Sequence, residues 1–305
     1  MTTYTTALPQ WGIIRLAGAD AAQFIHNQLT QDFLLIKENQ ARLAAWCSPK
    51  GRVIVSFYGW RPSAEEVLLL CPLDSIEFAI KRLSMFVLRS KVKVSNASAE
   101  FSICGTLTPT AALDNSTINS GALPLAASDG TYALQLPSVA HAAAGDLGHF
   151  SPVIAVKPAS AAIETAATAH LDLWNEVQVL SGVAIIGETL REAFVPQMIN
   201  YESVGAVNFK KGCYPGQEIV ARSQFRGQIK RRAYIVQADS ALAAGAAVLT
   251  ASDAECGLVV MAAPAAQGGW HAIVSVQSEQ SNEALHVGDQ ALHLLPLPYA
   301  LAQDI

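Results

Sequence analysis

The sequence predicts an α+β fold in which a longer N-terminal part, residues 1–230, precedes a C-terminal β-barrel at residues 231–305. Runs with helical spacing alternate with β-like runs as far as residue 180, whereas only short β runs follow residue 232. Charge changes at the same place. Residues 1–232 hold all 20 Lys and Arg and 18 Asp and Glu, and residues 233–305 hold seven acids and no Lys or Arg. Such a change is typical of a domain boundary.

Composition narrows the class of protein. Hydrophobic residues make up 51% of the chain and charged residues 15%, which indicates a compact globular protein with a sizeable core. No apolar run approaches the roughly 18 residues of a membrane-spanning helix, and residues 1–10 do not resemble a secretory signal. The five cysteines are odd in number and widely spaced, which favours reduced thiols. We therefore expect a cytoplasmic protein without membrane contact. No C-x-x-C or H-x-x-x-H spacing occurs, so no metal site is predicted.

The first elements follow from periodicity and turn chemistry. Residues 11–16 predict a strand, and a helix is expected to open at residues 18–20 because apolar side chains then recur at helical spacing. Residues 41–47 and 52–59 are β-like. The four residues between them, Ser48-Pro49-Lys50-Gly51, suit a type I turn, since Pro favours its second position and Gly its fourth. A hairpin is therefore predicted.

The remaining elements are placed in the same way. Residues 66–71 predict a strand, after which Asp74 is expected to cap a helix with an apolar stripe. Residues 95–168 are rich in Ala, Ser and Pro, with strands expected near 101–104 and 132–136. Residues 171–180 predict a helix. The barrel strands are expected at residues 233–237, 246–250, 257–262, 271–276 and 290–294.

The residues richest in chemical groups are 210–222, KKGCYPGQEIVAR. Lys210 and Lys211 precede Cys213, and nearby positive charge favours the thiolate, which is the reactive form of cysteine. Two glycines and a proline shape the backbone around it. A small buried cysteine in a structural turn is the alternative. The adjacent charges and glycines favour a functional thiol.

This segment resembles the signature K-G-C-Y-x-G-Q-E of the YgfZ family, which Lys211–Glu218 matches with one free position. The likeness extends to Phe194–Gln197, to Phe225-Arg226-Gly227 and, near the termini, to residues 18–32 and 292–299. It therefore covers nearly the whole chain. The YgfZ family consists of folate-binding proteins tied to iron–sulfur cluster maintenance and tRNA modification. It is similar to the aminomethyltransferase (T-protein) of the glycine cleavage system.

The resemblance implies a folate-binding body with mixed sheets and a ferredoxin-like part, and tetrahydrofolate or another folate as cofactor. It assigns folate contacts to Trp11 and Trp174, whose indole rings can stack on a flat heterocycle. Without the resemblance, both would be read as ordinary core residues. It makes Cys213 a reactive or transiently ligating thiol and Lys211 its electrostatic partner. The other residues of the signature assigned to the folate site are Lys211, Tyr214, Gly216, Gln217 and Glu218.

Three functions remain open from the sequence. The first is a folate-dependent accessory protein for iron–sulfur cluster assembly or repair, and thereby for tRNA modification. The second is a one-carbon transfer enzyme of the aminomethyltransferase type, although the predicted hairpin departs from the G-G-x-x-D-D of those enzymes. No Asp or Glu occurs between Glu38 and Glu65 to manage proton transfer. The third is a non-catalytic module that senses folate. Dinucleotide-binding, P-loop and α/β-hydrolase motifs do not occur.

A basic run surrounds the signature. Seven cations fall within residues 210–232, opposed only by Glu218. A solvated face is one interpretation, and a docking surface for an anion is the other. The expected partners are folate and iron–sulfur client or assembly proteins. Direct nucleic-acid binding is not expected of an acidic protein with few aromatic residues in this stretch.

Overall fold

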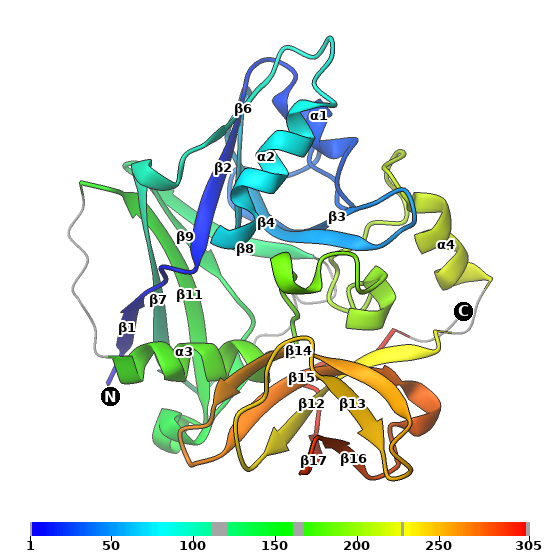
Figure 1. The fold of residues 1–305 in the computed structure, drawn as a ribbon. Coiled ribbons are helices and arrows are strands. Elements are labelled where there is room, and N and C mark those ends of the chain that lie inside the picture. The colour runs from blue at the N-terminus through cyan, green and yellow to red at the C-terminus, as the bar shows by residue number, and fades with distance from the viewer. Residues whose placement is uncertain (1, 112–120, 161–167, 227–228, 303–305) are drawn as a thin grey trace.

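The computed structural model describes residues 2–111, 121–160, 168–226 and 229–302. A strongly curled sheet forms the upper and left parts of the molecule, and a closed β-barrel lies below it (Figure 1). The α+β class and the C-terminal barrel are confirmed. Gly227, part of the downstream likeness, lies outside the described residues. Among these residues no helix is long and apolar enough to cross a membrane.

The sheet has eleven strands, with the order β1-β7-β11-β9-β8-β3-β4-β5-β2-β6 and β10 paired to β11. Its strands are β1 (Tyr4–Ala7), β2 (Trp11–Ala17), β3 (Gln40–Cys47), β4 (Val53–Ser63), β5 (Glu66–Pro72), β6 (Lys93–Asn96), β7 (Phe101–Thr110), β8 (Ala122–Ser128), β9 (Thr131–Gln135), β10 (Val139–Ala140) and β11 (His149–Pro158). Every pairing among the described strands is antiparallel, where the resemblance implied mixed sheets. Neighbouring strands are joined by hairpins or long returns, which bring them back antiparallel.

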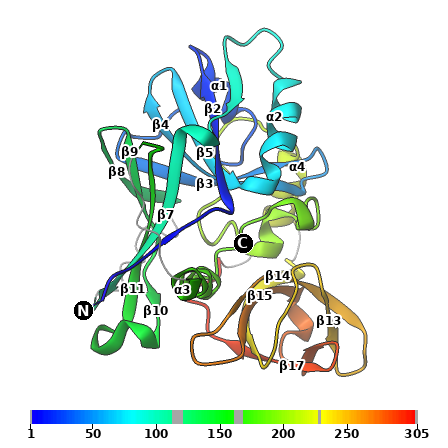
Figure 2. The ribbon, with the colours of Figure 1, turned by 60° about the vertical axis from the view of Figure 1, so that its left-hand side comes forward.

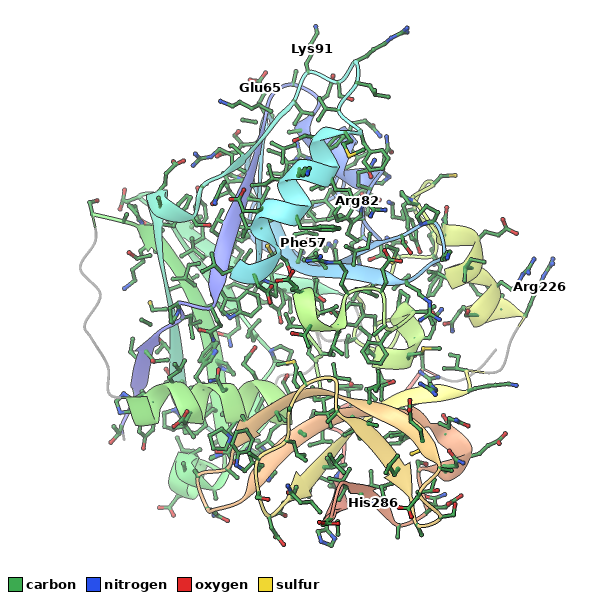
Figure 3. The ribbon with its side chains drawn as sticks, viewed as in Figure 1. Phe57, Glu65, Arg82, Lys91, Arg226 and His286 are labelled. Carbon is green, nitrogen blue, oxygen red and sulfur yellow. The ribbon has the colours of Figure 1, made fainter. Side chains whose placement is uncertain are left out.

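The predicted hairpin forms as expected. Residues of β3 and β4 pair from Ala41 with Trp60 to Cys47 with Val53, around the turn at residues 48–51. Helices α1 (Ala21–His26) and α2 (Ile76–Ser84) cover the upper face of this sheet (Figure 1). A core that includes Phe57 of β4 and the buried stripe of α2 lies between them (Figure 3). Burying these apolar faces is what holds two short helices on the sheet.

Helix α3 (Thr168–Leu180) lies between the sheet and the barrel, where Figure 2 shows it nearly end-on. The barrel consists of β12 (Arg231–Ala238), β13 (Ala247–Thr250), β14 (Glu255–Pro264), β15 (Trp270–Gln277), β16 (Leu285–Val287) and β17 (Gln290–Leu295). Its interior has a core of its own. The outer residues of β14 and β15 instead join the core of the N-terminal part.

Buried polar contacts tie the end of the chain to the N-terminal part. The hydroxyl of Tyr299 donates to the carbonyl of Gly182 at 2.7 Å, and Arg232 of the first barrel strand forms a buried ion pair with Glu202. These contacts cross the expected boundary at residue 231. The division into 1–230 and 231–305 as separate domains stays a prediction.

Two local differences from the prediction concern helices. Asp74 does not cap α2, because a 3-10 turn, η1 (Leu73–Ser75), precedes the helix and places Ser75 at its N-cap. Asp74 instead accepts hydrogen bonds from the Ser75 hydroxyl and the Glu188 amide. The second difference is α4 (Gln217–Phe225), a helix that was not predicted. It buries only Val220 and Gln224, so its sequence carries no apolar stripe.

Candidate functional site

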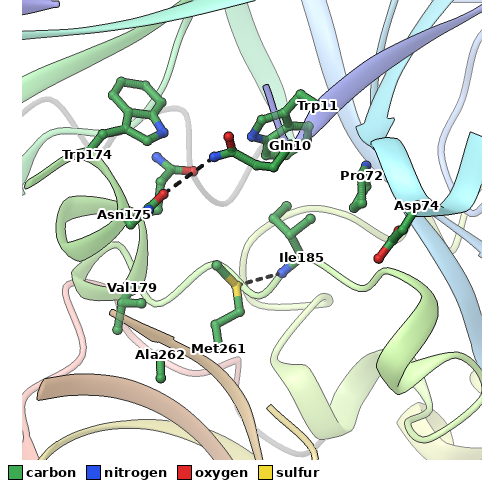
Figure 4. A pocket seen from close by; sticks show the side chains of 11 residues that line it. Gln10, Trp11, Pro72, Asp74, Trp174, Asn175, Val179, Ile185, Met261 and Ala262 are labelled. Carbon is green, nitrogen blue, oxygen red and sulfur yellow. Dashed lines mark hydrogen bonds between the residues drawn. The ribbon is translucent and has the colours of Figure 1, made fainter. Parts of the chain in front are cut away.

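A cavity of about 240 Å³ opens where β2, η1, α3 and β14 meet (Figure 4). We call it the tryptophan cavity. It is lined by Gln10, Trp11, Pro72, Asp74, Trp174, Asn175, Gln178, Val179, Ile185, Met261 and Ala262. The structure thus brings Trp11 and Trp174, which are 163 positions apart in the chain, to the same cavity. Strand β2 and helix α3 supply them, and the barrel strand β14 closes one side.

The two indoles are held by their surroundings. Trp11 is the first residue of β2, and its ring lies 5.9 Å from that of Tyr58. Trp174 is 1% exposed and lies flat against Gly105 of β7, where a Cβ atom would stand 2.6 Å from Cδ2 of the indole. A glycine is therefore needed at position 105 for the indole to adopt this position. Both rings are buried in packed positions at the cavity.

The indole nitrogen of Trp174 is buried and has no hydrogen-bond partner. In Figure 4 it faces the side chains of Gln10 and Asn175, which contact each other at 3.5 Å. A buried N–H group without a partner is costly, and a ligand with an acceptor atom removes that cost. Together with Gln178, these groups give an apolar cavity a small set of hydrogen-bonding side chains. This is the usual composition of a small-molecule site.

Of the residues that the structure describes, Asp74 is the one carboxylate that lines the cavity. Its oxygens accept from Ser75 at 2.8 Å and from the amide of Glu188 at 3.3 Å. Gly187 lies directly against it, since a Cβ atom there would approach Asp74 Oδ1 to 2.9 Å. The carboxylate is thus positioned by neighbours at the rim of the cavity.

The signature loop, residues 210–216, lies elsewhere, over the end of α1 and the turn of the β3–β4 hairpin. Lys211 is buried, and its ammonium group donates to the carbonyls of His26 and of Leu29, the latter at 2.7 Å. It also lies 4.9 Å from the ring centre of Tyr214. Burial lowers the pKa of Lys211 to about 8, while the charges of Asp32 and Cys213 act in the opposite direction. Lys211 therefore anchors the loop as well as placing a positive charge beneath it.

Cys213 is exposed, while the other four cysteines, Cys47, Cys71, Cys104 and Cys256, are buried. Burial raises the pKa of each of these four thiols. Cys213 is thus the thiol that solvent and reagents reach. Among the described residues, no group of three or more His, Cys, Asp or Glu side chains is arranged to hold a metal ion.

The rest of the signature shapes the loop. Gly216 has φ +79°, and a Cβ atom there would overlap the carbonyl of Ser48 and stand 2.7 Å from the nitrogen of Gly51. Only glycine combines this backbone conformation with so close an approach to the hairpin turn. Tyr214 is buried beneath the loop, and burial raises the pKa of its hydroxyl.

Gln217 and Glu218 begin α4. The amide of Gln217 donates to the carbonyl of Tyr214 at 3.2 Å, and exposed Glu218 pairs with Arg222 at 3.5 Å one turn later. The outer side of this helix forms a shallow groove of about 420 Å³ lined by Glu218, Ala221, Arg222, Phe225 and Arg226. Arg226 extends into solvent at its end (Figure 3).

The predicted site residues therefore fall into two groups. Trp11 and Trp174 line the tryptophan cavity, and none of its lining residues comes from residues 210–218. Lys211, Cys213, Tyr214, Gly216, Gln217 and Glu218 form the signature loop and the start of α4. The basic run also divides, because Lys211 and Arg232 are buried. We call its other members, which are exposed or half-buried, the basic face: Lys210, Arg222, Arg226, Lys230 and Arg231.

Sequence reasoning missed the polar side chains of the cavity. Gln10 and Asn175 each adjoin one of the tryptophans, so their positions were a usable signal. The position of Met261 gave no such signal, because this residue belongs to the barrel and reaches the cavity only through the packing of β14 on α3.

Comparison with known proteins tests the resemblance to the YgfZ family. No protein-family model matches the chain. The tRNA-modifying protein YgfZ of Colwellia psychrerythraea is 28% identical over 235 residues, which cover 75% of this chain and 70% of that protein. The tRNA-modifying protein YgfZ of Hamiltonella defensa is 28% identical over 250 residues, covering 74% and 68%. The resemblance to the YgfZ family is confirmed.

The fold has a solved counterpart. Aminomethyltransferase T of the glycine cleavage system from Bartonella henselae superposes with a TM-score of 0.63, covering 98% of this chain and 86% of that protein. At 14% identity, this likeness concerns the fold alone.

Proposed function

We propose that the protein is a cytoplasmic folate-binding accessory protein that acts in iron–sulfur cluster assembly or repair, and thereby in tRNA modification. The observation that carries the folate part is the tryptophan cavity, in which Trp11, Trp174 and an unpartnered buried N–H group meet. The role in tRNA modification is supported by similarity to proteins named for that activity. Its partners would be tetrahydrofolate and iron–sulfur client proteins.

The cavity suits the ring system of a folate. Its volume of about 240 Å³ falls below the roughly 300–1,000 Å³ of pockets that enclose a whole drug-sized ligand. It therefore favours the bicyclic pterin head, with the remainder of the molecule leaving through the opening. A pterin carries both hydrogen-bond donors and acceptors, and the cavity offers the Trp174 N–H and three side-chain amides to them. Indole faces supply stacking worth about 0.5–1.5 kcal/mol per aromatic pair beyond the buried area.

Cys213 would supply the chemistry of the accessory role, as a reactive thiol or as a transient ligand of a client's cluster. Its exposure allows a partner protein to reach it. The ammonium group of Lys211 beneath the loop favours the thiolate.

The position of Asp74 supports one further candidate function, that of an enzyme of the aminomethyltransferase type. The hairpin turn at residues 48–51 carries no acid, but Asp74 lines the cavity from another element. Transfer of a one-carbon group to folate needs a group that handles the proton at the reacting nitrogen. Formation of a methylene-tetrahydrofolate from an aminomethyl donor, lost in Asp74→Asn, would establish this activity. If folate binds but no product forms, the aminomethyltransferase activity is excluded and the accessory function remains.

The test of the proposed function is a titration with tetrahydrofolate followed by tryptophan fluorescence. We expect quenching, and an affinity at least about tenfold lower in Trp174→Phe and Trp11→Phe, which corresponds to about 1.4 kcal/mol. Phenylalanine is preferred to alanine because emptying a buried aromatic site costs roughly 3–5 kcal/mol of stability. Trp46→Phe is the matched control, since Trp46 is equally buried but lies in the core under α2. Unchanged affinity in both cavity variants would refute the assignment.

A further inference from the structure

Helix α3 borders the tryptophan cavity and also a second cavity of about 200 Å³. Glu176 and Leu180 line the second cavity. The residues of α3 that line the tryptophan cavity are Trp174, Asn175, Gln178 and Val179. Because successive residues of a helix are about 100° apart around its axis, the two sets lie on different sides of α3. A contact that fixes Glu176 therefore also fixes the rotation of α3, and with it the side chains at the tryptophan cavity.

The carboxylate of Glu176 is held mainly by the barrel. Only 3% of its side chain is exposed. Its Oε1 atom lies 3.1 Å from Nδ1 of His271 on β15, and its Oε2 atom accepts from the amide of Ala266 at 2.9 Å, in the turn between β14 and β15. From the N-terminal part, Nε2 of His141 lies 3.1 Å from Oε2. One buried carboxylate thus contacts both parts of the molecule.

Glu176 is ionised at neutral pH. Burial raises its pKa, but the contacts with His141, His271 and the amide of Ala266 outweigh burial and leave a pKa of about 2. An ionised carboxylate only accepts hydrogen bonds, so Nδ1 of His271 is the donor. Hydrogen bonds to a charged group are directional and roughly twice as strong as those between neutral groups. Apolar packing is non-directional, so the hydrogen bonds of Glu176 set the rotation of α3 more closely than its apolar side chains do.

The barrel segment that holds Glu176 also lines the tryptophan cavity. Met261 and Ala262 of β14 face this cavity (Figure 4), and Ala266 follows Ala262 by four residues. We propose that Glu176 is a positioning residue of the tryptophan cavity, which holds the side of α3 that carries Trp174 in place relative to β14. The C-terminal barrel then takes part in ligand binding. This consequence for binding rests on the folate part of the proposed function.

The test uses the full-length protein labelled with 5-fluorotryptophan, in which fluorine NMR reports on the five tryptophans, assigned by single Trp→Phe variants. We expect Glu176→Leu and His271→Leu to shift or broaden the resonance of Trp174, because each leaves a buried polar group without one of its partners. Glu176→Gln and His271→Asn keep a hydrogen-bonding group at the same place and should restore the wild-type resonance. The resonance of Trp46, in the core under α2, should stay constant in all four variants.

The second measurement is the affinity for tetrahydrofolate. Both leucine variants should bind at least tenfold more weakly, and both conservative variants within about twofold of the wild type. His286→Leu is the matched control and should leave both the affinity and the Trp174 resonance unchanged. His286 is also a partly exposed histidine of the barrel, with Nε2 at 2.9 Å from the carbonyl oxygen of Thr250, but it lies at the lower end of the barrel (Figure 3).

An unchanged Trp174 resonance in folded Glu176→Leu and His271→Leu would overturn the proposal. An equal shift in His286→Leu would also overturn it, because the shift would then reflect a general loss of stability. Thermal unfolding shows which variants fold, and His271→Leu gives the reading if Glu176→Leu does not fold. If the wild type does not bind tetrahydrofolate while the resonance shifts as expected, the folate proposal fails and the positioning role of Glu176 stands.

Discussion

The tryptophan cavity and the signature loop differ in which chemical group each leaves without a partner. The cavity buries an indole N–H without a partner among aromatic and amide side chains. In the loop, the Lys211 ammonium donates to two carbonyls, and the exposed group is the thiol of Cys213. The first arrangement is suited to holding a ligand, and the second to reacting with one. The proposed folate binding and the proposed thiol reactivity therefore fall on different segments of the chain.

The largest expected effect separates these two regions in cells. In a strain that lacks the protein, Cys213→Ser should fail to restore modified nucleosides in bulk tRNA, with a loss of at least about tenfold. The purified variant should still bind tetrahydrofolate like the wild type, because Cys213 does not line the cavity. Restoration of the modified nucleosides by Cys213→Ser would make the thiol a structural residue. A large loss of folate affinity in this variant would show that the two regions form one site.

The second prediction concerns Lys211 and the pH dependence of stability. Its pKa of about 8 in the folded protein is below the roughly 10.4 of an unfolded chain, so the unfolded state holds more protons between these values. The contribution of Lys211 to the free energy of unfolding should therefore rise with pH in this window, by up to about 2 kcal/mol. The four buried thiols act in the opposite direction in wild type and variant alike, so the difference between the two proteins isolates Lys211. Lys211→Met should lack this rise. At pH 9.5 the amine of the wild type no longer carries a buried charge, so the variant should be less stable than the wild type.

Urea midpoints at pH 7.5 and 9.5 measure this difference. Lys210→Met is the matched control, because the neighbouring lysine is exposed. Equal changes in wild type and Lys211→Met would mean that the ammonium is not held in a buried position. The window stays below pH 10 because burial raises the pKa of Tyr58, Tyr201 and Tyr299, whose titration affects stability above it.

The smallest expected effect concerns the basic face. Reversing Arg226, Lys230 and Arg231 to Glu should weaken binding of poly-L-glutamate severalfold at low salt, and much less at high salt, because exposed charges are screened over roughly 10 Å at 0.1 M. The matched control reverses three other exposed lysines, which are Lys81 of α2, Lys91, and Lys93 of β6. Lys91 lies at the top of the molecule, away from Arg226 (Figure 3). Equal losses of poly-L-glutamate affinity in both triple variants would show that the basic face is only a solvated charged surface without a specific docking role.

Much of the fold could be predicted from local signals. The hairpin of β3 and β4 followed from alternation and a proline–glycine turn, and α3 from its spacing of apolar residues. Helix α4 was missed because its only buried side chains are Val220 and Gln224, which give no stripe. Strands β8 and β11 were missed because they lie in a stretch rich in Ala, Ser and Pro, where β pairing across the sheet decides the structure.

The candidate site was predictable only in part. The resemblance indicated Trp11 and Trp174, but their meeting depends on contacts across the whole N-terminal part and on a glycine at position 105. The anchoring of the signature loop on α1 had no motif either, because it depends on the tertiary contact between Lys211 and the carbonyl of His26. Side chains that act through long-range packing leave no local pattern in a single sequence.

A crystal structure of the protein with tetrahydrofolate would test the central claim most directly. The account predicts the pterin ring between Trp11 and Trp174, with an acceptor atom of the ligand within about 3 Å of Nε1 of Trp174. It also predicts that Sγ of Cys213 makes no contact with the reactive nitrogens of the folate. A pterin ring bound over the signature loop, with the tryptophan cavity left without ligand, would contradict it.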